Sequence, residues 1–399
     1  MLMSSNVCNN IKGIFINNSF KEVIKVYEKH KIYAKIFNIL RKFPQKNNKI
    51  TLLTNKNHSF EANLEYIAKE LDNRNDSGKN YEYKFIPKDS LSFSNIRDFA
   101  SSKYVFLVDN FFPLAFMNVE GMKWVQLWHG TGLFKKFGYD LLNDEDKKIM
   151  EMFAPKIDLV SVSSENVADI YARNFYVDKS KVKPFGVPRN DFYDEEHLSD
   201  DYLSNLRESF EKDYPQLKGK KLVLYAPTFR EDPKNNAVFA YFDVEKFLNE
   251  LGDEYALAIR LHPNYKRFCD EEHNIDLEDL TNRYDIINFT GFKDEQKLLI
   301  LADILVADYS SIMVDYTILK KPAILFDYDL EDYLYKERGF YFDYEEMVPG
   351  KIVYNIDELI EAIKEEDFRL EKMDEFLKFQ FGEFKPNSSK LILDYILED

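Results

Sequence analysis

The sequence predicts an α/β protein built from two open parallel-sheet domains, and three observations carry this prediction. Apolar runs of about four to eight residues alternate with amphipathic stretches of helical period, which is the pattern of strand–helix–strand units. An acidic stretch at 194–202 interrupts the pattern, and a second set of strands begins after it. The length of 399 residues leaves room for a hydrophobic core in each half.

The first domain is expected over residues 49–198 and the second over 199–375. Parallel strands need long crossovers, so helices are expected between them, for example at 60–72 and 94–100. The expected strands of the first domain are 49–55, 81–87, 103–110, 124–130 and 158–164. Those of the second domain are 218–229, 255–263, 284–292, 303–311 and 321–329. Residues 376–399 are expected to form a C-terminal helical tail.

Residues 1–48 are predicted as a basic, amphipathic helical segment. Apolar residues recur at helical spacing over 20–43, and Pro44 ends the pattern. The first 50 residues carry a net charge of +8, against −24 for the remainder of the chain. This helix is interpreted in two ways: it packs on the following domain, or it lies on an anionic membrane surface.

Composition excludes several other classes of protein. A net charge of −16 argues against a general nucleic-acid-binding protein. No apolar run approaches the ~20 residues that span a bilayer, and the start of the chain lacks the order of a signal peptide. Two isolated cysteines, Cys8 and Cys269, form neither a disulfide framework nor a metal cluster. A cytoplasmic protein is therefore expected.

Polar residues gather where the predicted strands end. In open α/β folds, ligands bind at the carboxyl ends of the strands, so these residues are expected to share a cleft between the domains. Each has an ordinary alternative, such as a helix cap for a serine pair or a surface ion pair for an arginine. The candidates are His129, Gly130, Thr131, Thr228, Arg230, Arg260, His262, Asp308, Ser310, Ser311, Asp315 and Asp327.

The chemistry of these groups suits a pyrophosphate. Ser310 and Ser311 are expected at a helix N-terminus, where backbone N–H groups favour anions. Arg230, Arg260, Lys135 and Lys136 supply positive charge. The sequence has no GxxxxGK[ST] loop and no GxGxxG fingerprint, and its Cys/His spacings fit no zinc site.

At these residues the chain resembles the CDP-glycerol glycerophosphotransferase family, the primases and polymerases of teichoic-acid synthesis. The motifs occur in order over roughly residues 100–350. They are QLWHGT (126–131), GVPRND (186–191), YAPTFR (225–230), RLHP (260–263), ADYSS (307–311), FDYDLEDY (326–333) and RGFYFD (338–343). One departure is visible, since Gly132 stands where many members carry proline after the HGT triplet, and this exchange is expected to loosen the turn.

The resemblance implies a GT-B fold and transfer of a polyol phosphate from CDP-glycerol or CDP-ribitol to a hydroxyl acceptor, with release of CMP. The implied acceptor is a lipid-linked glycan or a growing polyol-phosphate chain at the inner face of the cell membrane. The family's two essential histidines correspond to His129 and His262. His129 is assigned as the base and His262 as the group that stabilises the departing phosphate, although these roles can be exchanged.

Several roles stay open. Arg189, Asn190 and Asp191 either line the cleft or form a turn beside the hinge. Asp327 either binds hydroxyls of the ligand or caps the loop after its strand. No obligatory protein-bound metal and no cofactor are expected. The sequence also leaves the polyol and the number of units added undecided.

Two other functions are compatible with the same sequence. The first is a GT-B glycosyltransferase with a nucleotide-sugar donor. The second is a non-catalytic scaffold, against which the presence of both histidines and both arginines argues.

Overall fold

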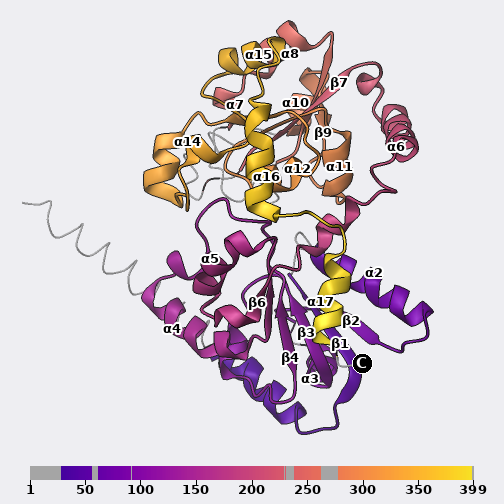
Figure 1. Cartoon of the computed structure of the whole chain (residues 1–399), viewed down its shortest axis with the longest axis vertical. Coiled ribbons are helices and arrows are strands. Elements are labelled where there is room, and N and C mark those ends of the chain that lie inside the picture. The colour runs from indigo at the N-terminus through magenta and orange to yellow at the C-terminus, as the bar shows by residue number, and fades with distance from the viewer. Residues whose placement is uncertain are drawn as a thin grey trace, which may run out of the picture.

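The computed structural model describes residues 28–55, 62–90, 92–228, 230, 238–261 and 277–397. It contains two α/β domains, one above the other in Figure 1, each built on a six-stranded sheet. Every strand pairing in both sheets is parallel. The two-domain GT-B class predicted for the chain is therefore confirmed.

The first sheet has the strand order β2-β1-β3-β4-β5-β6. Its strands are β1 (Lys46–Thr54), β2 (Glu82–Pro87), β3 (Ser102–Leu107), β4 (Lys123–Gln126), β5 (Leu159–Ser161) and β6 (Val182–Lys183). Its helices include α2 (Ala62–Asp76), α3 (Phe93–Ala100), α4 (Asp144–Phe153) and α5 (Glu165–Phe175). The central strands are buried on both faces, which explains their continuous apolar sequences.

The second sheet has the strand order β12-β11-β10-β7-β8-β9. Its strands are β7 (Lys221–Ala226), β8 (Tyr255–Ile259), β9 (Ile287–Asn288), β10 (Ile304–Ala307), β11 (Ala323–Phe326) and β12 (Lys351–Val353). The order reverses between β7 and β10, so the crevice of a doubly wound sheet lies at their carboxyl ends.

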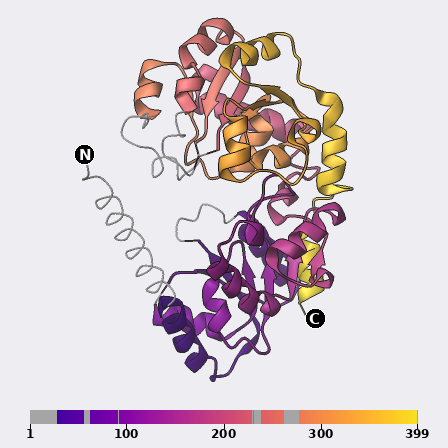
Figure 2. The ribbon, with the colours of Figure 1, turned by 90° about the vertical axis from the view of Figure 1, so that its left-hand side faces the viewer.

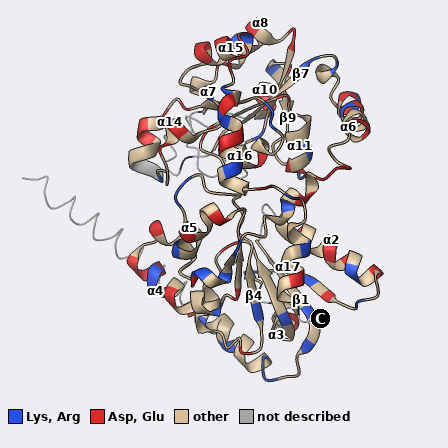
Figure 3. Ribbon diagram, viewed as in Figure 1, with Lys and Arg blue, Asp and Glu red and all other residues tan. Residues whose placement is uncertain are grey.

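Helices cover both faces of the second sheet. The longer ones are α6 (Asp200–Asp213), α8 (Val244–Leu251), α10 (Leu277–Arg283), α11 (Glu295–Leu301) and α15 (Ile356–Lys364). The short ones are α7 (Val238–Tyr241), α12 (Ile312–Thr317), α13 (Leu330–Asp332) and α14 (Tyr344–Met347). Acidic residues lie along outer helices such as α6 and α15 (Figure 3), in keeping with the negative net charge.

Every predicted strand falls on an observed one, and two observed strands were not predicted. These are β6, with two residues, and β12, with three. Both lie at a sheet edge, and segments this short carry no periodic signal.

The C-terminal tail belongs to both domains. Helix α16 (Met373–Phe381) packs on the second domain, whereas α17 (Ser388–Ile396) returns to the first, as Figure 2 shows. Ile392 and Leu393 of α17 are buried against Ile50 and Leu52 of β1. The chain therefore returns to the first domain at its C-terminal end, a feature that the expected boundaries at 199–375 and 376–399 did not include.

The N-terminal helix is described from residue 28 and runs to residue 40; residues 20–27 of the predicted helix lie outside the described part. One face is buried in the first domain through Tyr33, Ala34 and Phe37. The side chain of Arg41, just after the helix, donates to the carbonyl oxygen of Ala100 at 3.0 Å. Among the described helices, none has the length and apolar character needed to cross a bilayer.

Candidate active site

His129 lies on a tight turn directly after β4. Its Nδ1 is 3.1 Å from the carbonyl oxygen of Val108, which follows the neighbouring strand β3. A carbonyl oxygen only accepts, so in the neutral imidazole the proton sits on Nδ1 and the lone pair on Nε2. Burial lowers the pKa of His129, and the carboxylate of Asp109 opposes that shift. The neutral form is the one that can accept a proton.

The residue before His129 has an unusual backbone conformation. Trp128 has a φ of 57°, in the left-handed region that non-glycine residues rarely adopt. Such a conformation costs about 1–3 kcal/mol and persists only where the surroundings impose it. Gln126 accepts from the Trp128 N–H at 2.8 Å, and the indole lies 4.0 Å from the His129 ring between centroids. The turn is therefore held in a strained form.

Arg189 links this turn to the second domain. Its Nε and Nη2 donate to Oδ2 of Asp315 at 3.0 and 2.6 Å. Its Nη1 donates to the carbonyl oxygen of His129 at 2.6 Å, and Nη2 also donates to Oγ1 of Thr131 at 2.9 Å. The Asp315 side chain is 1% exposed, and its burial raises the pKa of its carboxyl group while Arg189 opposes the shift. Arg189, Thr131 and Asp315 were all predicted to bind substrate. They form a buried, hydrogen-bonded cluster between the domains.

The segment that follows the turn crosses into the second domain. Phe134 is buried in the second domain's core, against Phe340 and Tyr344. Lys135 pairs with Phe340 in an isolated antiparallel bridge, and the Lys136 N–H donates to the carbonyl oxygen of Gly339 at 3.1 Å. The backbone of both lysines is therefore fixed at the domain interface.

Gly132 is required where it stands. Its φ is +60°, and a Cβ atom added there would lie 2.2 Å from Oε1 of Gln380. Proline fixes φ near −65°, so the proline found in many relatives cannot adopt this conformation. Gly132 was expected to loosen the turn, but the close contact with Gln380 shows a tightly packed one.

Ser311 faces the same turn from the second domain. A Cβ atom built on Gly130 would lie 3.9 Å from Oγ of Ser311. Oγ of Ser310 accepts from the backbone N–H of Ile312 at 3.3 Å, so this hydroxyl caps the start of α12. Helix α12 has only six residues.

Arg230 is wholly buried, with 0% of its side chain exposed. Its Nη1 donates to Oδ2 of Asp308 at 3.0 Å, and its Nε donates to Oδ2 of Asp329 at 2.7 Å. Oδ1 of Asp308 accepts from the Thr228 N–H at 2.8 Å, which ties the ends of β7 and β10 together. In this arrangement Arg230 neutralises two carboxylates of its own domain.

Asp327 is buried beside this cluster, where burial and the nearby Asp308 raise the pKa of its carboxyl group well above its usual range.

Arg260 and Asp191 bond to groups outside the His129 turn. Arg260 is partly buried and donates to Oε2 of Glu295 at 3.1 Å. Asp191 accepts from the backbone N–H groups of Ser388 and Ser389 at 2.7 and 2.8 Å, so it caps α17 and ties the two interdomain crossovers together. The neighbouring Asn190 is buried. His262 lies outside the described residues.

Sequence reasoning missed two residues that hold the His129 turn, Asn63 and Gln380. Both are buried carboxamides that bond to backbone atoms of the turn. Neither belongs to a motif or to the carboxyl end of a strand, so no pattern in the sequence pointed to them. Within the described ranges, no group of three or more His, Cys, Asp or Glu side chains is arranged to hold a metal ion.

Two parallel-sheet domains whose strand ends meet at one interface define the GT-B class of α/β proteins. The chain belongs to the CDP-glycerol:poly(glycerophosphate) glycerophosphotransferase family, whose match covers residues 35–398. This result confirms the family inferred from the motifs.

Individual relatives give the same result. The chain is 33% identical to a teichoic acid poly(ribitol-phosphate) polymerase of Bacillus spizizenii, over 90% of this chain and 58% of that protein. It is 31% identical to a teichoic acid glycerol-phosphate primase of Bacillus subtilis, over 73% of each chain. A solved structure of the wall teichoic acid polymerase TagF aligns with a TM-score of 0.72 at 23% identity, covering 95% of this chain and 97% of that one. The chain thus spans little more than half of the polymerase and most of the primase.

Proposed function

We propose that this chain transfers a polyol phosphate from a CDP-activated donor to a hydroxyl acceptor, in the synthesis of a teichoic-acid or capsule-type polymer. The acceptor hydroxyl attacks the β-phosphorus of the donor and gives its proton to Nε2 of His129. The bond between the β-phosphorus and the oxygen of CMP breaks, and CMP leaves with the bonding electrons. These roles make the chain a phosphotransferase of the CDP-glycerol glycerophosphotransferase type.

The observation that carries the proposal is the position of His129. The Val108 carbonyl selects the tautomer with a lone pair on Nε2, and burial keeps the imidazole neutral at neutral pH. The turn also meets Ser311 of the second domain, so the base and the hydroxyls proposed to bind the pyrophosphate lie at one interface. Proximity of this kind accounts for much of the rate enhancement in phosphoryl transfer.

The names of the relatives suggest two donors, because the polymerase is named for ribitol phosphate and the primase for glycerol phosphate. A panel of CDP-glycerol, CDP-ribitol and UDP-sugars, tested with a lipid-linked acceptor analogue and with products sized by mass spectrometry, decides the donor and the number of units added. Release of CMP with either CDP-polyol supports the proposal. Release of UDP from a sugar donor, without CMP release, supports a glycosyltransferase instead and overturns it.

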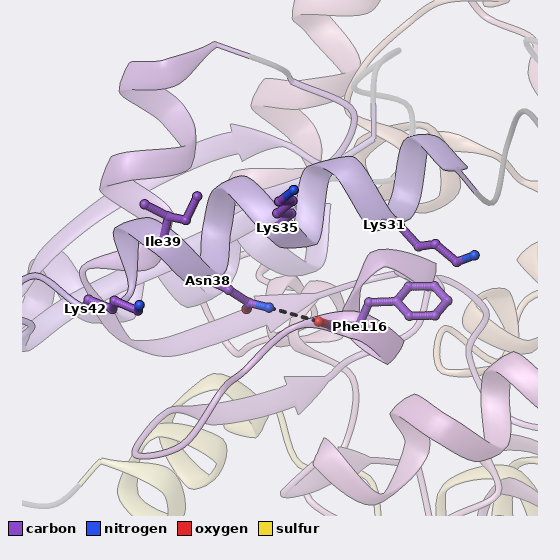
Figure 4. Close-up of a pocket in the computed structure, with 6 residues that line it drawn as sticks. All are labelled: Lys31, Lys35, Asn38, Ile39, Lys42 and Phe116. Atoms are coloured by element: carbon purple, nitrogen blue, oxygen red, sulfur yellow. Dashed lines mark hydrogen bonds between the residues drawn. The ribbon is translucent and has the colours of Figure 1, made fainter.

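We also propose that the enzyme acts at the cytoplasmic face of the membrane, where it binds anionic lipid through the outer face of helix 28–40. Lys31, Lys35 and Lys42 line a surface pocket there with Ile39 and Phe116 (Figure 4). Ile39 is 54% exposed, a large exposure for an apolar residue next to three lysines. Basic residues beside exposed apolar ones suit a headgroup and acyl boundary.

Vesicle binding tests this surface without removing the helix, whose other face is part of the core. Each basic residue near an anionic surface contributes about 1 kcal/mol, so Lys35→Glu/Lys42→Glu is expected to weaken binding to phosphatidylglycerol vesicles by at least about tenfold at low salt. Lys212→Glu, on α6 of the second domain, is the matched control. Unchanged vesicle binding by the double variant refutes the proposal.

A further inference from the structure

Two buried carboxamides hold the His129 turn, one from each domain. Asn63 lies on α2 of the first domain and is 2% exposed, and Gln380 lies on α16 and is 0% exposed. Their bonds go to the backbone on either side of His129.

Asn63 acts on the residue before His129. Its Nδ2 donates to the carbonyl oxygen of Trp128 at 2.8 Å, and its Oδ1 accepts from the backbone N–H of Arg189 at 3.0 Å. One amide therefore holds the strained Trp128 and the crossover that carries Arg189. The Arg189 side chain in turn donates to the carbonyl oxygen of His129.

Gln380 acts four residues after His129. Its Oε1 accepts from the Leu133 N–H at 2.6 Å, and its Nε2 donates to the Leu133 carbonyl oxygen at 2.7 Å. Both backbone groups of one residue are thus paired with one side chain. The close approach of this amide to Gly132 leaves no room for the backbone to shift toward it.

We propose that Asn63 and Gln380 are positioning residues that fix the imidazole of His129 for proton transfer. The segment between their contacts contains His129 and Thr131, which the Arg189 side chain also holds. Loss of either amide frees one end of the segment, and the left-handed Trp128 then relaxes toward an ordinary conformation. The kinetic part of this inference rests on the proposed function; the positioning part does not.

The groups that face His129 determine how its titration reports the position of the ring. Asp109 raises the pKa of His129, whereas Arg189 and Lys88 lower it, and burial lowers it most. Lys88 and Asp109 pair with each other at 2.6 Å. Relaxation of the turn exposes the imidazole, so its pKa is expected to rise toward 6.5, the value of an unperturbed histidine.

The test uses apolar variants of similar shape, Asn63→Leu and Gln380→Met, which add no charge near His129. The matched control is Asn75→Leu on the same helix. Asn75 accepts from the Tyr81 N–H at 2.7 Å and donates to the Tyr81 carbonyl oxygen at 3.0 Å, at the opposite end of α2 from Asn63. Asn63→Ser, which keeps a hydroxyl able to make one of the two bonds, is the milder variant if Asn63→Leu does not fold.

Two measurements separate positioning from folding. NMR titration of the six histidines, with His129 assigned by its own variant, follows the imidazole without any turnover. Steady-state kinetics with a CDP-polyol donor gives kcat, KM and the pH profile. We expect the His129 midpoint to rise in both variants, kcat to fall by at least about tenfold relative to Asn75→Leu, and the donor KM to change by less than about threefold.

The results distinguish this inference from the proposed function. An unchanged His129 titration, or a kcat no lower than that of the control, overturns the positioning role. A wild-type chain that transfers no polyol phosphate overturns the proposed function, whereas the titration still decides whether the two amides hold His129.

Discussion

Loss of the Arg189–Asp315 pair is expected to destabilise the protein strongly, because both partners are buried. The Arg189 side chain is 10% exposed and the Asp315 side chain 1%. Arg189→Met leaves the Asp315 carboxylate in the domain interface without its counter-charge. Breaking a buried pair in this way costs about 3–5 kcal/mol. For domains of this size, about 2–4 °C in Tm is lost per kcal/mol, so the melting temperature should fall by about 6–20 °C.

The size of the Tm loss shows whether burial of the ion pair, and not ion pairing alone, determines its contribution to stability. Lys320 and Asp374 form an ion pair of the same 2.6 Å length, but their side chains are 58% and 76% exposed. Exposed pairs contribute about 0–1 kcal/mol, so Lys320→Met should hardly change the Tm.

A double-mutant cycle completes the experiment. Arg189→Met/Asp315→Leu replaces the pair by apolar side chains and removes the uncompensated charge, so it should recover most of the lost Tm. Differential scanning calorimetry of the four proteins gives the coupling. A single variant that loses no more than the Lys320→Met control, or a double variant whose losses simply add, would refute the assignment of a buried interdomain pair.

Three further predictions concern the site. His129→Ala and His262→Ala should each lower turnover by at least ~10²-fold with an unchanged Tm, and the depressed pKa of His129 should place the acidic limb of the wild-type kcat/KM profile below pH 6.5. The pKa of Asp327 is raised in the folded protein, whereas in the unfolded chain this carboxyl group loses its proton above about pH 4. Above that pH, Asp327 therefore destabilises the folded state. Asp327→Asn should therefore raise the Tm at pH 7, and this gain should disappear as the pH falls toward 4; an equal gain at both pH values contradicts a buried neutral carboxyl group. Gly132→Ala should lower both Tm and kcat, because its Cβ would lie 2.2 Å from Gln380, and a wild-type melting curve would argue against that contact.

The sheets could be predicted from sequence because their strands are buried on both faces. Strands such as β7 and β8 are apolar almost throughout, and this signal does not depend on the rest of the chain. Ligands of open α/β folds bind at the carboxyl ends of the strands, and this rule also located the turn of His129 and the serines at the start of α12. The edge strands β6 and β12 were not predicted, because segments of two or three residues are too short to show an alternation of apolar and polar residues.

The contacts of the site could not be predicted, because they depend on how the two domains meet. Arg230 and Arg189 have the residue type expected of phosphate ligands, yet both are neutralised by carboxylates far along the chain. Asp191 was expected either to line the cleft or to lie in a turn beside the hinge, and it caps a helix nearly 200 positions later. Such pairings leave no trace in local spacing, and the carboxamides Asn63 and Gln380 were missed for the same reason.

Phe134 provides a last test of how the domains are joined. It follows the QLWHGT motif of the first domain, five residues after His129, but is buried among aromatic side chains of the second domain. Phe134→Ala should cost about 3–5 kcal/mol as a core truncation. Because the lost contacts lie between the domains, calorimetry should also resolve two unfolding transitions in place of one. Phe247→Ala, a truncation within the second domain's own core, should lower the Tm by a similar amount without separating the transitions. If both variants unfold with the same number of transitions, the segment after His129 does not couple the two domains.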